Sequence, residues 1–234
     1  MLTSIKDNLL RVRERIAEAA HHAGRNPEET TLIGVSKTHP ASAIQEAFEA
    51  GLRHFGENRV QEWEGKKTDV EVLAATWHLI GHLQSNKAAR AAKAFHSIDS
   101  VDDFTLAQRL DRARAELATS ERLRVLIEVH LGGEETKSGV EESELPELAE
   151  KLAGLPRLEW AGLMCIPPFL EDPERVRPFF ARLRELRAQL ETRVGRKLPV
   201  LSMGMSHDFE AAILEGATEV RVGTALFGSR GTVQ

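Results

Sequence analysis

The chain has 234 residues, of which 41% are hydrophobic and 29% are charged, and this length is enough to bury one sizeable core. Its formal net charge of -5 provides no cationic excess for nucleic-acid phosphates, and no apolar run approaches the roughly 18 residues of a membrane-spanning helix. We therefore expect no nucleic-acid or membrane partners. The single cysteine, Cys165, and the absence of a charged leader before an apolar segment favour a cytoplasmic protein, and we also expect a monomer.

The first predicted element is a helix over residues 4–24, where Ile5, Leu9, Val12, Ile16 and Ala20 recur at helical spacing. After it, short apolar runs alternate with amphipathic stretches. The apolar runs predict eight strands, at residues 31–37, 53–57, 75–80, 95–98, 123–130, 157–164, 198–203 and 218–222. The amphipathic stretches predict helices between the strands, for example at residues 41–51, 101–117, 143–154 and 175–191.

Strands that alternate with helices imply a parallel sheet, and eight such units favour an α/β fold of the (β/α)8 TIM-barrel type over a doubly wound sheet. We expect a single domain over residues 1–234, because the glycine-rich stretch 130–139 lies between a strand and a helix and is typical of a loop. The N-terminal helix is an addition to the barrel, and we expect it to plug or flank the barrel bottom. Active sites in this fold lie at the carboxyl ends of the strands.

Lys37 lies where the first predicted strand ends, on the same face as Ile33 and Val35. An amine at the barrel mouth can lose its proton through partial burial and form a Schiff base with a carbonyl group. A single lysine at a strand end is more often only solvated, so the neighbouring motifs must decide between the two interpretations.

Two glycine-bearing turns follow the last two predicted strands, in "SMGMSHD" and "RVGTALFG". Ser206 lies in the first turn, and Gly223 and Thr224 lie in the second. Backbone N–H groups at helix starts bind anions, and the loops after strands 7 and 8 of a TIM barrel often hold phosphate. Ordinary turns can have the same composition. Together with Lys37, the turns indicate a ligand with a phosphate and an aldehyde, and pyridoxal 5′-phosphate fits.

Arg221 shares a face of the last predicted strand with Glu219 and Gly223. If that face points into the barrel, the guanidinium needs an acceptor, because a buried charge without a partner is costly. A pyridine nitrogen could be that acceptor, and so could the carboxylate of Glu219. Arginine donates a hydrogen bond but keeps its proton, so a pyridine ring in contact with it would stay uncharged and would be a weaker electron sink.

Six segments, "VSKTHP", "FGENRVQE", "WHLIGHLQSNK", "GLMCIPP", "LSMGMSHD" and "EVRVGTALFG", occur in this order along almost the whole chain. Together they closely resemble the YggS/PROSC family of pyridoxal phosphate homeostasis proteins, which is similar to the N-terminal barrel of alanine racemase, the fold type III arrangement. The resemblance implies that pyridoxal phosphate forms a Schiff base with Lys37. It also implies phosphate contacts from Ser206, Gly223 and Thr224, a pyridine contact from Arg221, and a pocket lined by Asn58, Met203 and Gly204.

Two positions depart from the pattern of that family. Arg59 stands where the family often has tyrosine, and His130 stands where it usually has asparagine. The E-x-x-K-x-G loop that follows still matches at Glu134, Lys137 and Gly139. The departures concern the polarity of the pocket rim and leave the lysine and the phosphate turns unchanged.

The sequence contains no tyrosine, whereas two-base racemases of this fold pair their lysine with a tyrosine and carry a second β domain. We expect no such domain after the last strand, and therefore an exposed cofactor with poor support for carbanion chemistry. We interpret the protein as a carrier that buffers pyridoxal phosphate or delivers it transiently to apo-enzymes without efficient turnover. The resemblance implies an effect on amino-acid and keto-acid balance.

Two other functions remain open. One is a pyridoxal-phosphate enzyme such as a racemase, with His130, His82 or Cys165 as its second acid–base group, although Cys165 is more typical of a packed small residue. The other is a metal-dependent hydrolase, suggested by the histidines near strand ends, which are His39, His82, His130 and His207. We disfavour a metal site because metallohydrolases of this fold carry a His-x-His pair on strand 1, where this chain has "GVSK".

Overall fold

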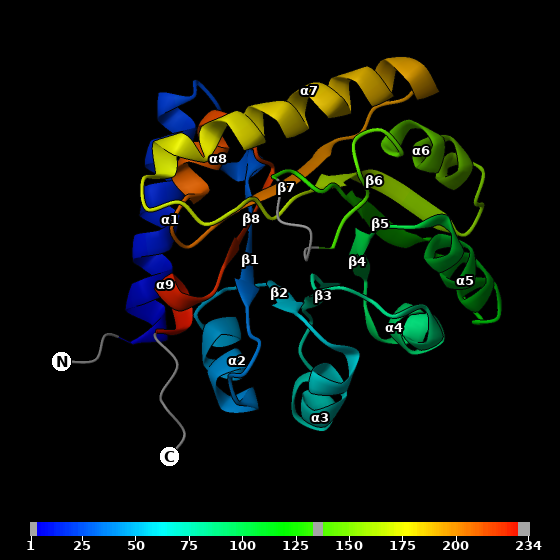
Figure 1. Cartoon of the computed structure of the whole chain (residues 1–234). Coiled ribbons are helices and arrows are strands. Elements are labelled where there is room, and N and C mark those ends of the chain that lie inside the picture. Colours follow the sequence, from blue (N-terminus) through cyan, green and yellow to red (C-terminus); the bar gives the residue numbers. More distant parts are fainter. Residues whose placement is uncertain (1–3, 133–137, 229–234) are drawn as a thin grey trace.

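Eight parallel strands form a closed barrel at the centre of the molecule (Figure 1). The computed structural model describes residues 4–132 and 138–228. Each strand pairs with its neighbours in sequence, and β1 closes the barrel by pairing with β8, where Thr31 lies opposite Glu219. The predicted TIM barrel is therefore confirmed. The strands are β1 Thr31–Val35, β2 His54–Glu57, β3 Thr76–Leu79, β4 Ser97–Val101, β5 Leu123–Glu128, β6 Leu158–Met164, β7 Val200–Met205 and β8 Glu219–Val222.

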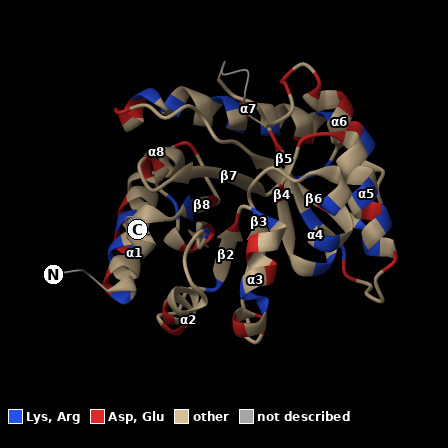
Figure 2. Cartoon of the chain, turned by 60° about the horizontal axis from the view of Figure 1, so that its bottom comes forward, with Lys and Arg blue, Asp and Glu red and all other residues tan. Residues whose placement is uncertain are grey.

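Helices surround the barrel, and their outer surfaces carry alternating acidic and basic segments (Figure 2). They are α1 Ile5–His22, α2 Ala41–Glu49, α3 Val60–Val70, α4 Ala88–Ala94, α5 Phe104–Ala115, α6 Leu145–Ala153, α7 Arg177–Val194, α8 Phe209–Leu214 and α9 Thr224–Phe227, with short 3-10 turns at Pro27–Glu29, Ser85–Lys87 and Pro173–Arg175. Their buried faces follow helical spacing, as in α7, where Phe180, Leu183, Leu186 and Leu190 face the core. None of the helices in the described ranges combines the length and the apolar character needed to cross a membrane.

The N-terminal helix α1 packs against the side of the barrel and not across its bottom. It contacts α2, α8 and α9, and Figure 1 shows it running beside α8 and α9. Leu9, Val12 and Ile16 form its buried face, and Ser4 caps its start by accepting the Asp7 N–H. Because α9 has only four residues, we infer that α1 covers the part of the barrel wall that a full eighth helix would cover. The expected place of this helix at the barrel bottom is corrected accordingly.

The fourth strand departs most from the sequence prediction, since it spans Ser97–Val101 and not residues 95–98. Aspartate and serine favour turns, so the sequence of this segment does not predict a strand. In the fold, Asp99 is fully buried in the barrel and accepts a hydrogen bond from the Ser97 hydroxyl. A polar strand is stable here because its buried side chains find partners inside the barrel.

Candidate functional site

Lys37 lies in a tight turn directly after β1, at the carboxyl end of the barrel. The His39 N–H donates to the Ser36 carbonyl over 3.1 Å and closes the turn, and Thr38 has a φ of 66°, which is uncommon for residues other than glycine. Since β1 ends at Val35, this turn and not strand alternation sets the position of the lysine. Lys37 borders a cavity of about 600 Å³ whose other lining residues are Thr38, Asn58, Arg59, Gln61 and Glu62.

A buried ion pair holds the residue that precedes Lys37. Lys66 Nζ on α3 donates to the Ser36 carbonyl (3.0 Å) and to Glu57 Oε1 at the end of β2 (2.9 Å). The Ser36 hydroxyl donates to the same carboxylate oxygen over 2.8 Å. Burial raises the pKa of Glu57, while Lys66 and the Ser36 hydroxyl act in the opposite direction. Neither member of this pair was predicted from the sequence. The position of Glu57 at a strand end, in "FGEN", was a signal for the glutamate, whereas Lys66 has no such signal.

The turns after β7 and β8 meet at the hydroxyl group of Ser206. Ser206 Oγ accepts hydrogen bonds from the N–H groups of Gly223 (3.2 Å) and Ala225 (3.4 Å). Thr224 lies between these two residues, is exposed and begins α9. The same N–H groups and hydroxyl could bind the oxygens of a phosphate. The structure therefore brings together the two turns that the sequence singled out.

Arg221 is buried inside the barrel, with 3% of its surface exposed. Its Nη1 donates to Ser202 Oγ and its Nη2 to the Cys165 carbonyl, each over 2.8 Å. Among the described residues it has no carboxylate partner, because Glu219, the alternative acceptor, pairs instead with Arg124 at 2.5 Å. A buried guanidinium that is held only by neutral acceptors can still donate to a ligand. This arrangement fits a pyridine nitrogen as the additional acceptor.

The three residues expected to line the pocket lie in different environments. Asn58 is half-buried after β2 and borders the cavity beside Lys37. Met203 is fully buried in the hydrophobic core. Gly204 has a φ of 93°, and a Cβ atom at this position would lie 2.6 Å from Ala212 Cβ on α8. Glycine therefore lets α8 pack closely against the end of β7, from which the Ser206 turn follows.

Glu128 at the end of β5 is a buried carboxyl group that no sequence motif indicated. It is 2% exposed, its Oε1 accepts from the Ser138 hydroxyl over 2.9 Å, and its Oε2 has no partner in the described ranges. Burial raises the pKa of Glu128, against the opposing effects of the Ser138 hydrogen bond and of Arg221. Its place at a strand end could have identified it. Glu134 and Lys137 of the adjoining loop lie outside the described residues.

The histidines proposed as metal ligands do not gather at one point. Their separate neighbours are Phe227 for His39, Asp102 for His82, Glu141 for His130, and the Leu170 and Glu171 carbonyls for His207. Across residues 4–132 and 138–228, one group of three side chains could together bind a metal ion, and it consists of His78, Asp99 and Glu219. The four predicted histidines therefore give no support to a hydrolase centre at the barrel mouth.

Cys165 is fully buried after β6. Burial raises the pKa of its thiol to about 12, so the sulfur stays protonated at neutral pH. The backbone carbonyl of this residue, and not its sulfur, contacts Arg221. The burial agrees with the prediction of a packed small residue and counts against a role in acid–base catalysis.

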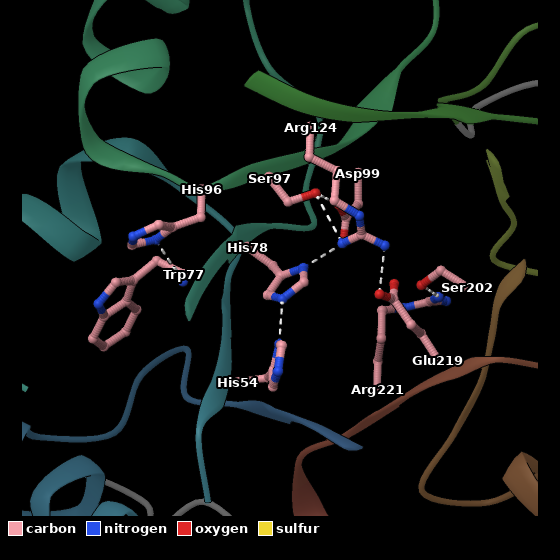
Figure 3. A network of polar contacts seen from close by, with 10 residues as sticks. All are labelled: His54, Trp77, His78, His96, Ser97, Asp99, Arg124, Ser202, Glu219 and Arg221. Carbon is pink, nitrogen blue, oxygen red and sulfur yellow. Dashed lines mark hydrogen bonds and ion pairs between the residues drawn. The ribbon is translucent and has the colours of Figure 1, made fainter. Parts of the chain in front are cut away.

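A network of polar and charged side chains fills the interior of the barrel (Figure 3). His78 lies between His54, at 3.1 Å, and Asp99, at 3.0 Å. On the other side of the network, Arg124 pairs with Glu219. Burial lowers the pKa of His54 to about 4. Since these groups provide partners for one another, the network stabilises the barrel interior and occupies Glu219.

Three comparisons with known proteins each match more than nine-tenths of the chain. Residues 8–231 match the alanine racemase N-terminal domain family. The pyridoxal phosphate homeostasis protein of Aquifex aeolicus is 48% identical over 224 residues, which cover 96% of this chain and 97% of that protein. PipY of Synechococcus elongatus, solved with pyridoxal phosphate bound, is 42% identical and has a TM-score of 0.81, covering 91% of this chain and 100% of PipY.

A more distant relative shows the fold alone. Alanine racemase of Corynebacterium glutamicum is 19% identical, with a TM-score of 0.67 over 96% of this chain and 62% of the racemase chain. The matched barrel is therefore only part of that enzyme. By its full-length similarity to curated members and by its barrel, the chain belongs to the family of pyridoxal phosphate homeostasis proteins, which is built on the alanine racemase N-terminal domain.

Proposed function

We propose that this protein binds pyridoxal 5′-phosphate reversibly and takes part in its homeostasis in the cytoplasm, buffering the cofactor or delivering it to apo-enzymes from one domain over residues 1–234. The observation that carries the proposal is the buried guanidinium of Arg221, whose acceptors among the described residues are all neutral. Arg221 lies on β8, and this strand leads into the contact between Ser206 and Gly223. The names of the relatives and the pyridoxal phosphate bound to PipY support it.

Each proposed contact follows from a group at the barrel mouth. The bound cofactor supplies an aldehyde, with which the Lys37 amine would form a Schiff base and release water. Ser206 and the backbone at Gly223 and Thr224 would hold the phosphate, and Arg221 would donate to the pyridine nitrogen. The further proposed contacts are Asn58, Met203 and Gly204.

Binding without efficient turnover is the second part of the proposal. Arg221 keeps its proton, so it leaves the ring uncharged and limits the electron sink. The chain has no tyrosine to act as a second base. Of the other candidates for that role, Cys165 is buried and burial raises the pKa of its thiol to about 12. His82 and His130 each contact a carboxylate through Nδ1, and the exchange assay below tests whether either of them acts as a base.

An absorbance spectrum tests the binding site. Protein incubated with pyridoxal phosphate should show a band near the edge of the visible range, and borohydride should bleach the band and fix the cofactor on Lys37, as located by mass spectrometry of peptides. Lys37→Ala should lose both the band and the attachment. Lys93→Ala is the matched control, because Lys93 is exposed on α4 and makes no ion pair with the described residues. If Lys37→Ala keeps the band, the assignment of Lys37 is wrong.

Two further assays separate a carrier from an enzyme. A carrier should restore the activity of an apo-enzyme at a rate that depends on the concentration of the loaded protein. An enzyme should exchange the α-proton of an amino acid with deuterated solvent, which NMR detects. Exchange at a rate comparable with that of a racemase would overturn the carrier proposal.

A further inference from the structure

A second cavity, of about 620 Å³, lies beside the cavity that contains Lys37. Its walls come from the carboxyl ends of β2 and β3, the start of α3 and the 3-10 turn Ser85–Lys87. Asn58, Arg59 and Gln61 border both cavities, so the two adjoin at the barrel mouth. Gly81 belongs to one wall, and a Cβ atom there would lie 2.5 Å from the Asn58 carbonyl oxygen. Glycine at this position therefore lets the two loops approach closely enough to form the wall.

Two cations line this second cavity, and its lining includes no carboxylate. Arg59 is exposed and Lys87 is half-buried, and neither side chain makes a hydrogen bond or ion pair within the part of the chain that the structure describes. Two carboxylates lie at the same end of the barrel, and both already have other partners. Glu62 accepts from Lys66, and Asp102 contacts His82. The positive charge of the cavity is thus not neutralised by the protein itself.

Neutral hydrogen-bond donors add to the two cations. The side-chain amides of Asn58, Gln61 and Gln84 line the cavity. No side chain caps the start of α3, and the backbone N–H groups of Val60 and Gln61 find no acceptor among the described residues. Cations and free N–H groups around one space favour an anion, because charge-assisted hydrogen bonds are stronger than neutral ones.

The position of the cavity indicates what kind of anion it holds. The strand order β7, β8, β1, β2, β3 places the Ser206–Gly223 contact on one side of Lys37 and the cavity on the other. Because the two cavities share Asn58, Arg59 and Gln61, a molecule that faces Lys37 with an amine or a carbonyl group would extend its opposite end toward the second cavity.

We propose that this cavity binds the carboxylate of a small amino acid or oxo acid whose other end faces Lys37, with Arg59 and Lys87 as the charged contacts. The inference rests on the proposed binding of pyridoxal phosphate at Lys37. The carrier would then bind a small carboxylic acid together with its cofactor.

Titration calorimetry with glutarate, a dicarboxylate without an amine, tests the cavity in protein freed of cofactor. Glutarate should bind in a saturable way, more weakly as sodium chloride is raised, and the uncharged diamide of glutarate should not bind. Arg59→Gln and Lys87→Gln should each weaken glutarate binding about five- to tenfold, as expected for the loss of one charge-assisted contact in a partly open site. Lys93→Gln makes the same change of net charge on α4, outside the cavity, and should leave the affinity unchanged.

Three results would overturn the inference. They are the absence of saturable glutarate binding, an affinity in both cavity variants equal to that of the parent protein, and a loss of affinity in Lys93→Gln as large as that in the cavity variants. Circular dichroism of each variant shows whether it is folded, and Arg59→Lys, which keeps the charge, should bind glutarate within about threefold of the parent protein. The absorbance titration of the parent protein with pyridoxal phosphate is a separate measurement. Absence of pyridoxal phosphate binding would overturn the proposed function, whereas absence of glutarate binding alone would overturn only the anion site.

Discussion

Replacing Lys66 by methionine tests whether the buried ion pair behind Lys37 maintains the turn that carries the lysine. Lys66→Met keeps an unbranched side chain but removes the ammonium group that donates to Glu57 (2.9 Å) and to the Ser36 carbonyl (3.0 Å). Glu57 is fully buried and would keep only the Ser36 hydroxyl as a side-chain donor. The substitution therefore leaves a carboxylate inside the protein without its counter-charge.

The structure sets the size of the expected effect. Removal of one partner from a buried ion pair costs about 3–5 kcal/mol, because the remaining charge stays desolvated. The Lys66 side chain is 14% exposed, so some water reaches the pair, and we expect a loss at the lower end of that range. A loss of about 3 kcal/mol lowers Tm by about 6–12 °C in a chain of this length.

Thermal unfolding followed by circular dichroism measures this loss and its pH dependence. Burial already holds the pKa of Glu57 above its ordinary value of 4.5, and without Lys66 the pKa rises further. A carboxyl group with a raised pKa in the folded state destabilises the fold at pH values above 4.5, and the destabilisation disappears as the pH falls and the group is protonated in both states. Lys66→Met should therefore lose more stability at pH 8 than at pH 5.

Two controls make the result decisive. Lys67→Met changes the neighbouring lysine, whose side chain is 46% exposed and pairs with Glu71 on the surface, and it should cost no more than about 1 kcal/mol. The double variant Glu57→Met/Lys66→Met removes both charges and should recover most of the loss. A Tm for Lys66→Met equal to that of Lys67→Met, or a double variant less stable than Lys66→Met, would refute the reasoning.

Three other predictions concern single groups. Arg221→Met should lower the affinity for pyridoxal phosphate at least about tenfold while Tm falls by no more than about 6 °C, because no carboxylate loses its partner; unchanged affinity in an absorbance titration would contradict it. Cys165 should react with iodoacetamide at pH 8 only on unfolding, since burial raises the pKa of its thiol to about 12, and rapid labelling of the native protein would contradict this. Because burial lowers the pKa of His54 to about 4 from 6.5, the unfolded chain takes up a proton first and stability should fall between pH 6.5 and pH 4. His54→Asn should flatten this decline in thermal unfolding, and an identical pH profile would rule out His54 as its source.

The sequence was sufficient to predict the barrel because alternating apolar and amphipathic runs report directly on burial. It also placed Lys37, Ser206 and Arg221 at or near strand ends, where a barrel places its chemistry, and the structure confirms these positions. Their contacts with a cofactor stay predictions. Lys66 could not be recognised, because a lysine on a helix that pairs with a buried glutamate has the same sequence pattern as a solvated one. Its partner Glu57 is nine positions away, and only the packing of α3 against β2 brings the two together.

The acceptor of Arg221 illustrates a second limit. Alternation along β8 places Arg221 and Glu219 on one face, and from the sequence alone either a carboxylate or a ligand could satisfy the guanidinium. The choice depends on Arg124, which is 95 positions from Glu219 and occupies its carboxylate from the opposite side of the barrel interior. Such a competition between distant residues for one partner has no local signature in a sequence.

The two cations proposed to contact the cofactor, Arg221 and Lys37, are held in different ways, and this difference bears on function. Among the described residues Arg221 has neutral acceptors only, so its charge remains available to a ligand, and an arginine guanidinium donates hydrogen bonds without giving up its proton. Lys37 lies in a turn whose preceding residue, Ser36, is fixed by Glu57 and Lys66. We infer that the site is organised to orient and retain pyridoxal phosphate, since a group that orients the ring without protonating it favours binding over the formation of a carbanion.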